Sequence, residues 1–135
     1  MTKAAKILIV DDDPDYVEVT KTILESENYN VAVAHSRSEA EQKIDQDRPD
    51  LIILDIIMER MNDGFTLCYD LKHDPVKKNI PVLAVSSVNQ VTGFSFSPDT
   101  DGEYFQADDF AEKPIQADDL LNRVDTLLKT KQDAD

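Results

Sequence analysis

The sequence is poor in the features that mark several common protein classes. It has a single cysteine, Cys68, which excludes an internal disulfide framework. No apolar run approaches the roughly 20 residues that a membrane-spanning helix needs. The residues before the first apolar run, at 1–6, are too few and too polar for a secretory signal. We therefore expect a cytoplasmic protein without a membrane span.

Positive charge is also scarce. The 135 residues include 14 Lys and Arg against 28 Asp and Glu, so the net charge is −14. Affinity for nucleic acid comes mainly from Lys and Arg, so we expect this domain to bind no nucleic acid and no anionic membrane. The stretch 79–112 holds six acidic residues and no basic one, and we expect it to face solvent, a cation or a basic partner.

Two short apolar runs each end in aspartate. Residues 7–10 lead into three aspartates at 11–13, and residues 51–54 lead into Asp55. Runs of this length, rich in β-branched residues, are typical of strands buried on both faces of a parallel sheet. Ligands of such sheets bind outside the carboxyl ends of the strands. Carboxylates gathered there repel one another, so the pattern predicts a cation, a proton or a phosphate–metal complex among them.

The rest of the chain alternates between strand and helix patterns. This alternation predicts a single α/β domain over 1–135, with a doubly wound five-stranded parallel sheet, right-handed crossovers and a frayed tail at 131–135. We expect strands at 7–10, 30–34, 51–55, 80–85 and 109–112, and helices near 14–27, 37–47, 63–73 and 118–130.

The segment 88–107 does not fit this alternation. It should hold the fourth crossover helix, but it lacks helical periodicity and contains Gly93, Pro98 and Gly102. We expect the helix to be degraded or replaced by a loop. Long loops in small domains are usually functional, so we interpret this segment as one that binds a partner or covers a site.

A polar residue ends or directly follows the first, third, fourth and fifth predicted strands. Besides the aspartates, Ser86 follows the fourth predicted strand, and Lys113 follows the fifth and precedes Pro114. Taken singly, each is more often a helix cap or a solvated surface residue. Asp13 in particular, followed by Pro14, is typical of a helix N-cap. The joint occurrence of these residues in this order is what favours a site.

In this order they resemble the receiver domain of two-component response regulators, whose stand-alone members are similar to CheY. The matching segments are ILIVDDDPD at 7–15, DLIILDIIM at 50–58, DGF at 63–65, IPVLAVSS at 80–87 and ADDFAEKP at 107–114. The resemblance implies a flavodoxin-like sheet with the strand order 2-1-3-4-5. It also implies a phosphorylation-dependent switch and not an enzyme with a substrate of its own.

The resemblance assigns a role to each strand-end residue. Asp55 would accept a phosphoryl group from a histidine kinase or a histidine phosphotransfer protein. Lys113 and Ser86 would bind the phosphoryl oxygens. Phe110 would be the switch residue, which turns inward after phosphorylation. The changed surface would then bind an output partner or domain, or a second copy in a phosphorylation-dependent dimer.

The same resemblance implies a magnesium site. Asp11, Asp12, Asp55 and the backbone carbonyl of Ile57 would hold Mg²⁺ together. The loop after Asp55 departs from the family pattern, since Glu59 replaces a usual proline and the loop has one extra residue. That shift affects the carbonyl of Ile57 more than the three carboxylates.

Two alternatives stay open at this stage. A Mg²⁺-dependent phosphatase of the haloacid dehalogenase type also uses an aspartate nucleophile, and residues 11–13 contain its Asp-x-Asp. That family needs a further acidic pair after a late strand, whereas Asp118 and Asp119 are expected to open a helix. A receiver-like scaffold that is never phosphorylated is the second alternative, although the presence of Asp55, Ser86 and Lys113 argues against it.

Overall fold

The computed structural model describes residues 5–55, 63–87, 108–113 and 115–134, and strands and helices alternate along them. In chain order the elements are β1 (Lys6–Val10), α1 (Pro14–Ser26), β2 (Asn30–Ala34), α2 (Arg37–Gln46), β3 (Leu51–Asp55), α3 (Asp63–His73), β4 (Val82–Ser87), β5 (Asp109–Lys113) and α5 (Ala117–Ala134). The fourth crossover, at 88–107, lies outside the described residues, so the expected loss of its helix stays a prediction.

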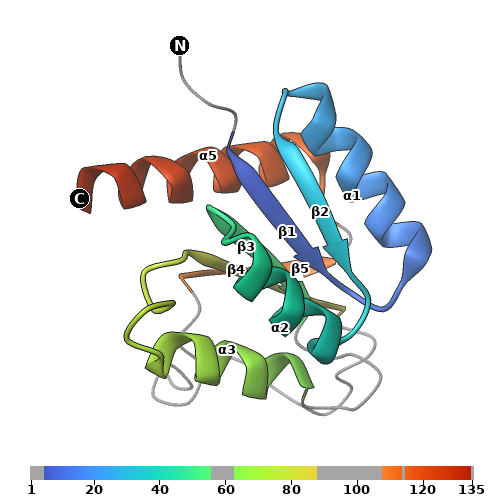
Figure 1. The fold of residues 1–135 in the computed structure, drawn as a ribbon. Coiled ribbons are helices and arrows are strands. Elements are labelled where there is room, and N and C mark those ends of the chain that lie inside the picture. Colours follow the sequence, from blue (N-terminus) through green and yellow to red (C-terminus); the bar gives the residue numbers. More distant parts are fainter. Residues whose placement is uncertain (1–4, 56–62, 88–107, 114, 135) are drawn as a thin grey trace.

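The strands form one five-stranded sheet in the order β2-β1-β3-β4-β5, in which every neighbouring pair is parallel (Figure 1). The strand count and order that the sequence and its resemblance implied are therefore confirmed. The central strand β3 is buried along its whole length, as its continuous apolar run predicted.

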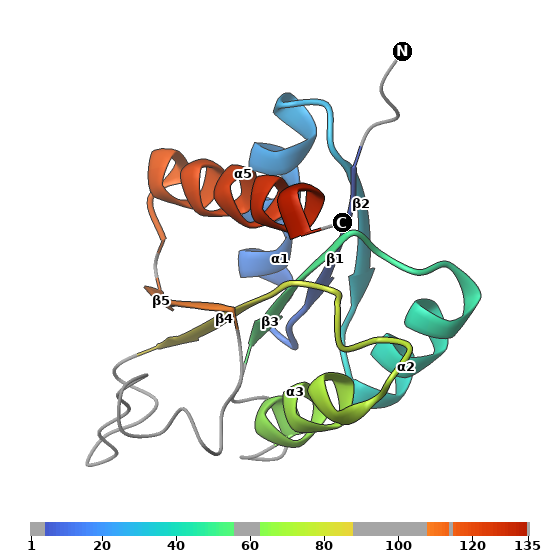
Figure 2. The ribbon, with the colours of Figure 1, turned by 90° about the vertical axis from the view of Figure 1, so that its left-hand side faces the viewer.

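Two apolar layers flank the sheet. Helices α1 and α5 lie on one face and α2 and α3 on the other (Figure 2). Successive strand residues point to opposite faces, so Leu8, Ile52 and Leu54 pack toward α2 and α3 while Ile7 and Ile53 pack toward α1 and α5. β1 and β3 are packed between these two layers, which fixes where the ends of the strands lie.

Two elements differ from the sequence prediction by more than one residue at a boundary. Strand β4 covers Val82–Ser87 instead of 80–85, because Ile80 is still in a turn, its N–H donating to the carbonyl of Lys77, and Pro81 has no N–H to donate. Ser86 therefore lies within the strand and not after it. Helix α5 continues to Ala134 where a frayed tail was expected from 131, in keeping with the good helix formers Lys131, Gln132 and Ala134.

Helix α5, at 18 residues, carries charged side chains along its length. Among the helices that the structure describes, none combines the length and the apolar character needed to cross a membrane.

Candidate functional site

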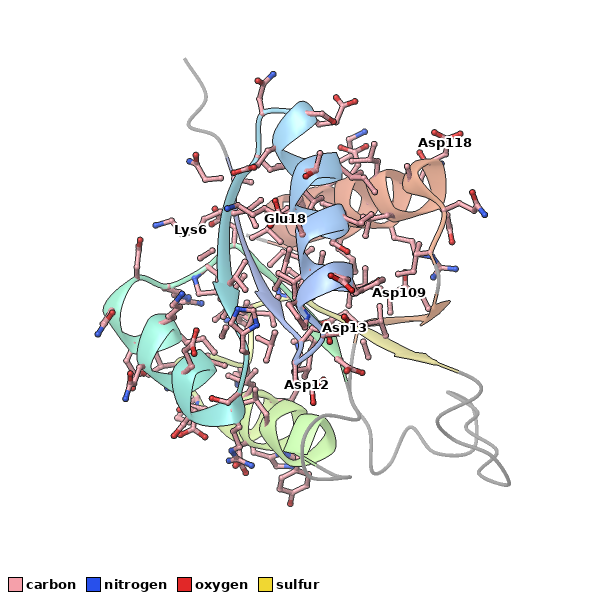
Figure 3. The ribbon with its side chains drawn as sticks, turned by 90° about the vertical axis from the view of Figure 1, so that its right-hand side faces the viewer. Lys6, Asp12, Asp13, Glu18, Asp109 and Asp118 are labelled. Atoms are coloured by element: carbon pink, nitrogen blue, oxygen red, sulfur yellow. The ribbon has the colours of Figure 1, made fainter. Side chains whose placement is uncertain are left out.

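The register of the sheet brings the aspartates of two strands together. Val10 of β1 pairs with Leu54 of β3, so the next residues, Asp11 and Asp55, lie level at the carboxyl edge. Carboxylate oxygens of Asp11, Asp12 and Asp55 all lie within 4.8 Å of one another. The acidic cluster that the sequence predicted at this edge is therefore present in the fold, and Figure 3 shows Asp12 at this end of the strands.

The three carboxylates differ in exposure. Asp11 and Asp55 are each only 1% exposed, whereas Asp12 is exposed to solvent. The Oδ1 atom of Asp11 accepts a hydrogen bond of 2.9 Å from the backbone N–H of Asp13. The backbone N–H of Asp11 donates to the carbonyl of Ala34 at 3.0 Å. These bonds connect Asp11 to the end of β2 and to the N-cap residue of α1. Asp12 faces the solvent from which a ligand would arrive.

Asp13 has a different role from its neighbours. Its carboxylate accepts hydrogen bonds from the backbone N–H groups of Asp15 at 3.0 Å and Tyr16 at 3.3 Å. Those groups are among the first N–H groups of α1, which have no partner within the helix. Asp13 is thus the N-cap of α1, as the sequence predicted, and it lies outside the three-carboxylate group.

The remaining predicted site residues lie on β4 and β5. Asp55 pairs with Val85 of β4, and beyond that level Ser86 pairs with Glu112 and Ser87 with Lys113. The backbones of Ser86 and Lys113 are thus at the same edge as Asp55. Their side chains and that of Phe110 are outside what the structure describes, as is the whole of Ile57.

The donor set of the cluster fits a hard divalent cation. All of its ligand atoms are carboxylate oxygens, and one of the three carboxylates is open to solvent. Mg²⁺ is usually bound by one or two carboxylates while it keeps several waters, which an exposed Asp12 would allow. Three carboxylates this close repel one another, and a bound cation offsets that repulsion.

One neighbour of the site was not predicted from the sequence. His35 is exposed and follows β2 directly, and its Nδ1 atom lies 3.3 Å from the backbone carbonyl oxygen of Asp11. The signal that could have revealed it is positional. A residue that ends β2 lies at the same sheet edge as the residues that end β1.

Comparison with known proteins agrees with this geometry. The family model described as the response regulator receiver domain matches residues 7–125. The DNA-binding dual master transcriptional regulator RpaA of Synechocystis is 34% identical over 92% of this chain and 49% of its own length. Response regulator MprA of Mycobacterium bovis is 33% identical over 98% of this chain and 54% of its own length. The chain thus spans about half the length of these relatives.

Solved structures show the same likeness. A CheY-like response regulator receiver domain from Methanospirillum hungatei superposes with a TM-score of 0.82 at 26% identity, covering 98% of this chain and 100% of that one. The signal receiver domain of a histidine kinase from Syntrophus aciditrophicus gives a TM-score of 0.78 at 35% identity, covering 94% and 92%. The likeness therefore extends over nearly the whole fold in both cases.

Proposed function

The chain belongs to the response regulator receiver domain family of two-component signalling, and on that premise we propose that it is a phosphorylation-dependent switch with Asp55 as its phosphoacceptor. The observation that supports this most is the group of three carboxylates, Asp11, Asp12 and Asp55, at the carboxyl edge of the sheet. A buried aspartate beside a cation site is suited to covalent transfer, because a carboxylate can act as a nucleophile once its charge is offset.

The transfer is a displacement at phosphorus. An Oδ atom of Asp55 forms the new P–O bond, and the P–N bond of a phosphohistidine on the kinase or phosphotransfer protein breaks. The electron pair of that bond stays on the imidazole nitrogen. Asp55 begins as a carboxylate and ends as an acyl phosphate, so no proton needs to leave it.

The carboxylates of Asp11 and Asp12, with Asp55 itself and the backbone carbonyl of Ile57, would hold Mg²⁺. When bound, Mg²⁺ screens the carboxylates from the phosphoryl oxygens and stabilises the transferring group. Asp11 is oriented for this by the N–H of Asp13, and Asp12 is exposed to the solvent from which the cation would arrive.

Residues on the two neighbouring strands would detect the new group. Phosphorylation adds about −1.5 to −2 charges and three strong acceptor oxygens. Lys113 would meet one of these oxygens as a point charge and Ser86 would donate its hydroxyl to another. Phe110 on β5 would then repack toward the space that Ser86 leaves.

This role makes the chain a regulatory domain and not an enzyme acting on a separate substrate. Its partners would be a histidine kinase or phosphotransfer protein upstream and an output protein or domain downstream, including a dimer that forms on phosphorylation. The acidic balance of the chain argues against direct nucleic acid contact by this domain. Asp118 and Asp119 lie in the first turn of α5, which does not favour a phosphatase of the dehalogenase type.

A beryllofluoride titration tests the proposal, because this ion mimics a phosphoryl group on a carboxylate. We expect saturable, Mg²⁺-dependent binding by the wild-type chain and none by Asp55→Ala. Changes in the NMR signals of β4 and β5 should accompany it. Binding that survives in Asp55→Ala, or no binding by the wild type, would count against a phosphoacceptor at this position and would favour a phosphatase or a scaffold.

A further inference from the structure

The sequence of β5 by itself specifies the pairing register of this strand only weakly. It lies at the edge of the sheet and pairs with β4 alone among the described strands. Its sequence, Asp-Phe-Ala-Glu-Lys, holds only two apolar residues, Phe110 and Ala111. Register is strongly specified only where an apolar face must be buried, so this short polar strand needs another means of fixing its position.

The first such means acts on Asp108, the residue directly before β5. Its N–H donates to the carbonyl of Val82 at 2.9 Å, and its Oδ2 atom accepts from the N–H of Val82 at 2.8 Å. The same Oδ2 accepts from the Nζ atom of Lys72, at the end of α3, at 2.6 Å. Asp108 is thus tied to the first residue of β4 by its backbone and its side chain at once.

Lys72 in turn connects Asp108 to the turn before β4. Its Nζ atom donates to the carbonyls of Ile80 at 2.9 Å and Lys78 at 3.2 Å as well as to Asp108. The Lys72 side chain is 9% exposed and that of Asp108 39%, so this ion pair is only partly open to water. Three acceptors share the Lys72 ammonium, which holds it in one position more firmly than a single surface partner would.

The second means acts on Asp109, the first residue of β5. Arg123 of α5 donates from one guanidinium nitrogen to both oxygens of Asp109, at 2.9 and 3.0 Å, and from Nε to Asp119 at 3.0 Å. Burial by itself lowers the pKa of Arg123, but hydrogen bonding to Asp119 and the charge of Asp109 outweigh it and raise the pKa, so the guanidinium stays charged.

The Lys72–Asp108 and Arg123–Asp109 ion pairs lie on opposite faces of the sheet. Lys72 belongs to α3 on one face and Arg123 to α5 on the other (Figure 2). Successive strand residues point to opposite faces, so Asp108 and Asp109 can each meet the helix that covers their own face. A slip by one residue would present each carboxylate to the wrong face and break both ties.

We infer that Lys72 and Arg123 are positioning residues, which fix the register of β5 from both faces and thereby place Lys113 at the carboxyl edge, two residues beyond the level of Asp55. This inference rests on the proposed function. A slip by one residue would move Lys113 by about 3.3 Å and turn its side chain to the other face. The carboxylates of Asp11, Asp12 and Asp55 would stay where they are, since neither Lys72 nor Arg123 contacts β1 or β3 through the bonds described.

The test separates Mg²⁺ binding from beryllofluoride binding in Lys72→Met, Arg123→Met and the double variant. For the double variant we expect the Kd for beryllofluoride to rise by at least about ten-fold, because misplacing a group by about 1 Å can cost up to 100-fold. The Kd for Mg²⁺ alone should stay close to that of the wild type. Amide hydrogens of Ala111 and Lys113 should exchange faster in the double variant.

Two surface lysines serve as matched controls. Lys77 pairs with Asp45 at 2.7 Å and Lys129 with Asp125 at 3.0 Å, and neither touches β5 in the described contacts. Lys77→Met and Lys129→Met should leave both Kd values near those of the wild type. Where a methionine variant does not fold, Lys72→Arg, Arg123→Lys and Asp108→Asn replace it, and at least one should weaken beryllofluoride binding selectively.

The outcomes are distinguishable. Wild-type affinity for beryllofluoride in every folded variant would overturn the inference and leave the proposed function intact. An equal loss of Mg²⁺ and beryllofluoride affinity would also overturn it, since that is the result of general destabilisation. A wild-type chain that binds no beryllofluoride would instead contradict the proposed function itself.

Discussion

Asp12→Ala is expected to abolish Mg²⁺ binding and to slow phosphorylation of the chain by a small phosphodonor such as phosphoramidate. The affinity for Mg²⁺ and the rate of phosphorylation should each fall by at least about 100-fold, since even groups that only orient metal ligands contribute about 10–100-fold. Asp12 is exposed, so removing its carboxylate should cost little folding energy. Mg²⁺ affinity from a calorimetric titration and the initial rate of phosphorylation measure the two effects.

The adjacent Asp13 provides the matched control. Its carboxylate caps α1, so Asp13→Ala should lower the free energy of unfolding by about 1 kcal/mol while Mg²⁺ affinity stays near that of the wild type. The two neighbouring aspartates should therefore give opposite profiles. Loss of Mg²⁺ binding in Asp13→Ala, or retention of it in Asp12→Ala, would contradict the division of roles described above.

Leu54→Ala is expected to have the largest effect on stability. Leu54 is fully buried on the central strand, among residues from β1, β4, α2 and α3, and it directly precedes Asp55. Truncating such a leucine costs about 2–5 kcal/mol, because the lost burial adds to the cavity left behind. Domains of this kind are stable by only about 5–15 kcal/mol, so a large part of the folding free energy would be lost.

Urea unfolding followed by circular dichroism measures this cost. Val19→Ala is the control, because Val19 is apolar but 59% exposed on α1, and its truncation should change stability by less than about 0.5 kcal/mol. A cost below about 1 kcal/mol for Leu54→Ala would show that β3 is not the packed centre that the fold indicates.

The sequence predicted those features that depend on local pattern. Buried parallel strands need continuous apolar runs, so residues 7–10 and 51–54 identified β1 and β3, and the aspartates that follow were placed at the same edge. Asp13 was identified as a cap because a short polar side chain directly before a proline-initiated helix can accept the first N–H groups of that helix, and in the structure it does so.

The features that depend on distant residues were not predicted. Lys72 and Asp108 are 36 positions apart, and no spacing rule links the end of α3 to the start of β5. The contact of His35 with the carbonyl of Asp11 likewise follows from the pairing of β1 with β2 and not from either segment alone. The start of β4 was misplaced because Ile80 and Pro81 are apolar like the strand that they precede.

The central claim is that Asp55 accepts the phosphoryl group, and the most direct measurement is to find where that group is attached. The chain is treated with phosphoramidate and Mg²⁺, and its mass and the modified peptide are determined. We predict one phosphoryl group per chain, on Asp55, absent in Asp55→Ala and absent when Mg²⁺ is chelated. A phosphoryl group on Asp11, or one that Asp55→Ala still acquires, would contradict the account.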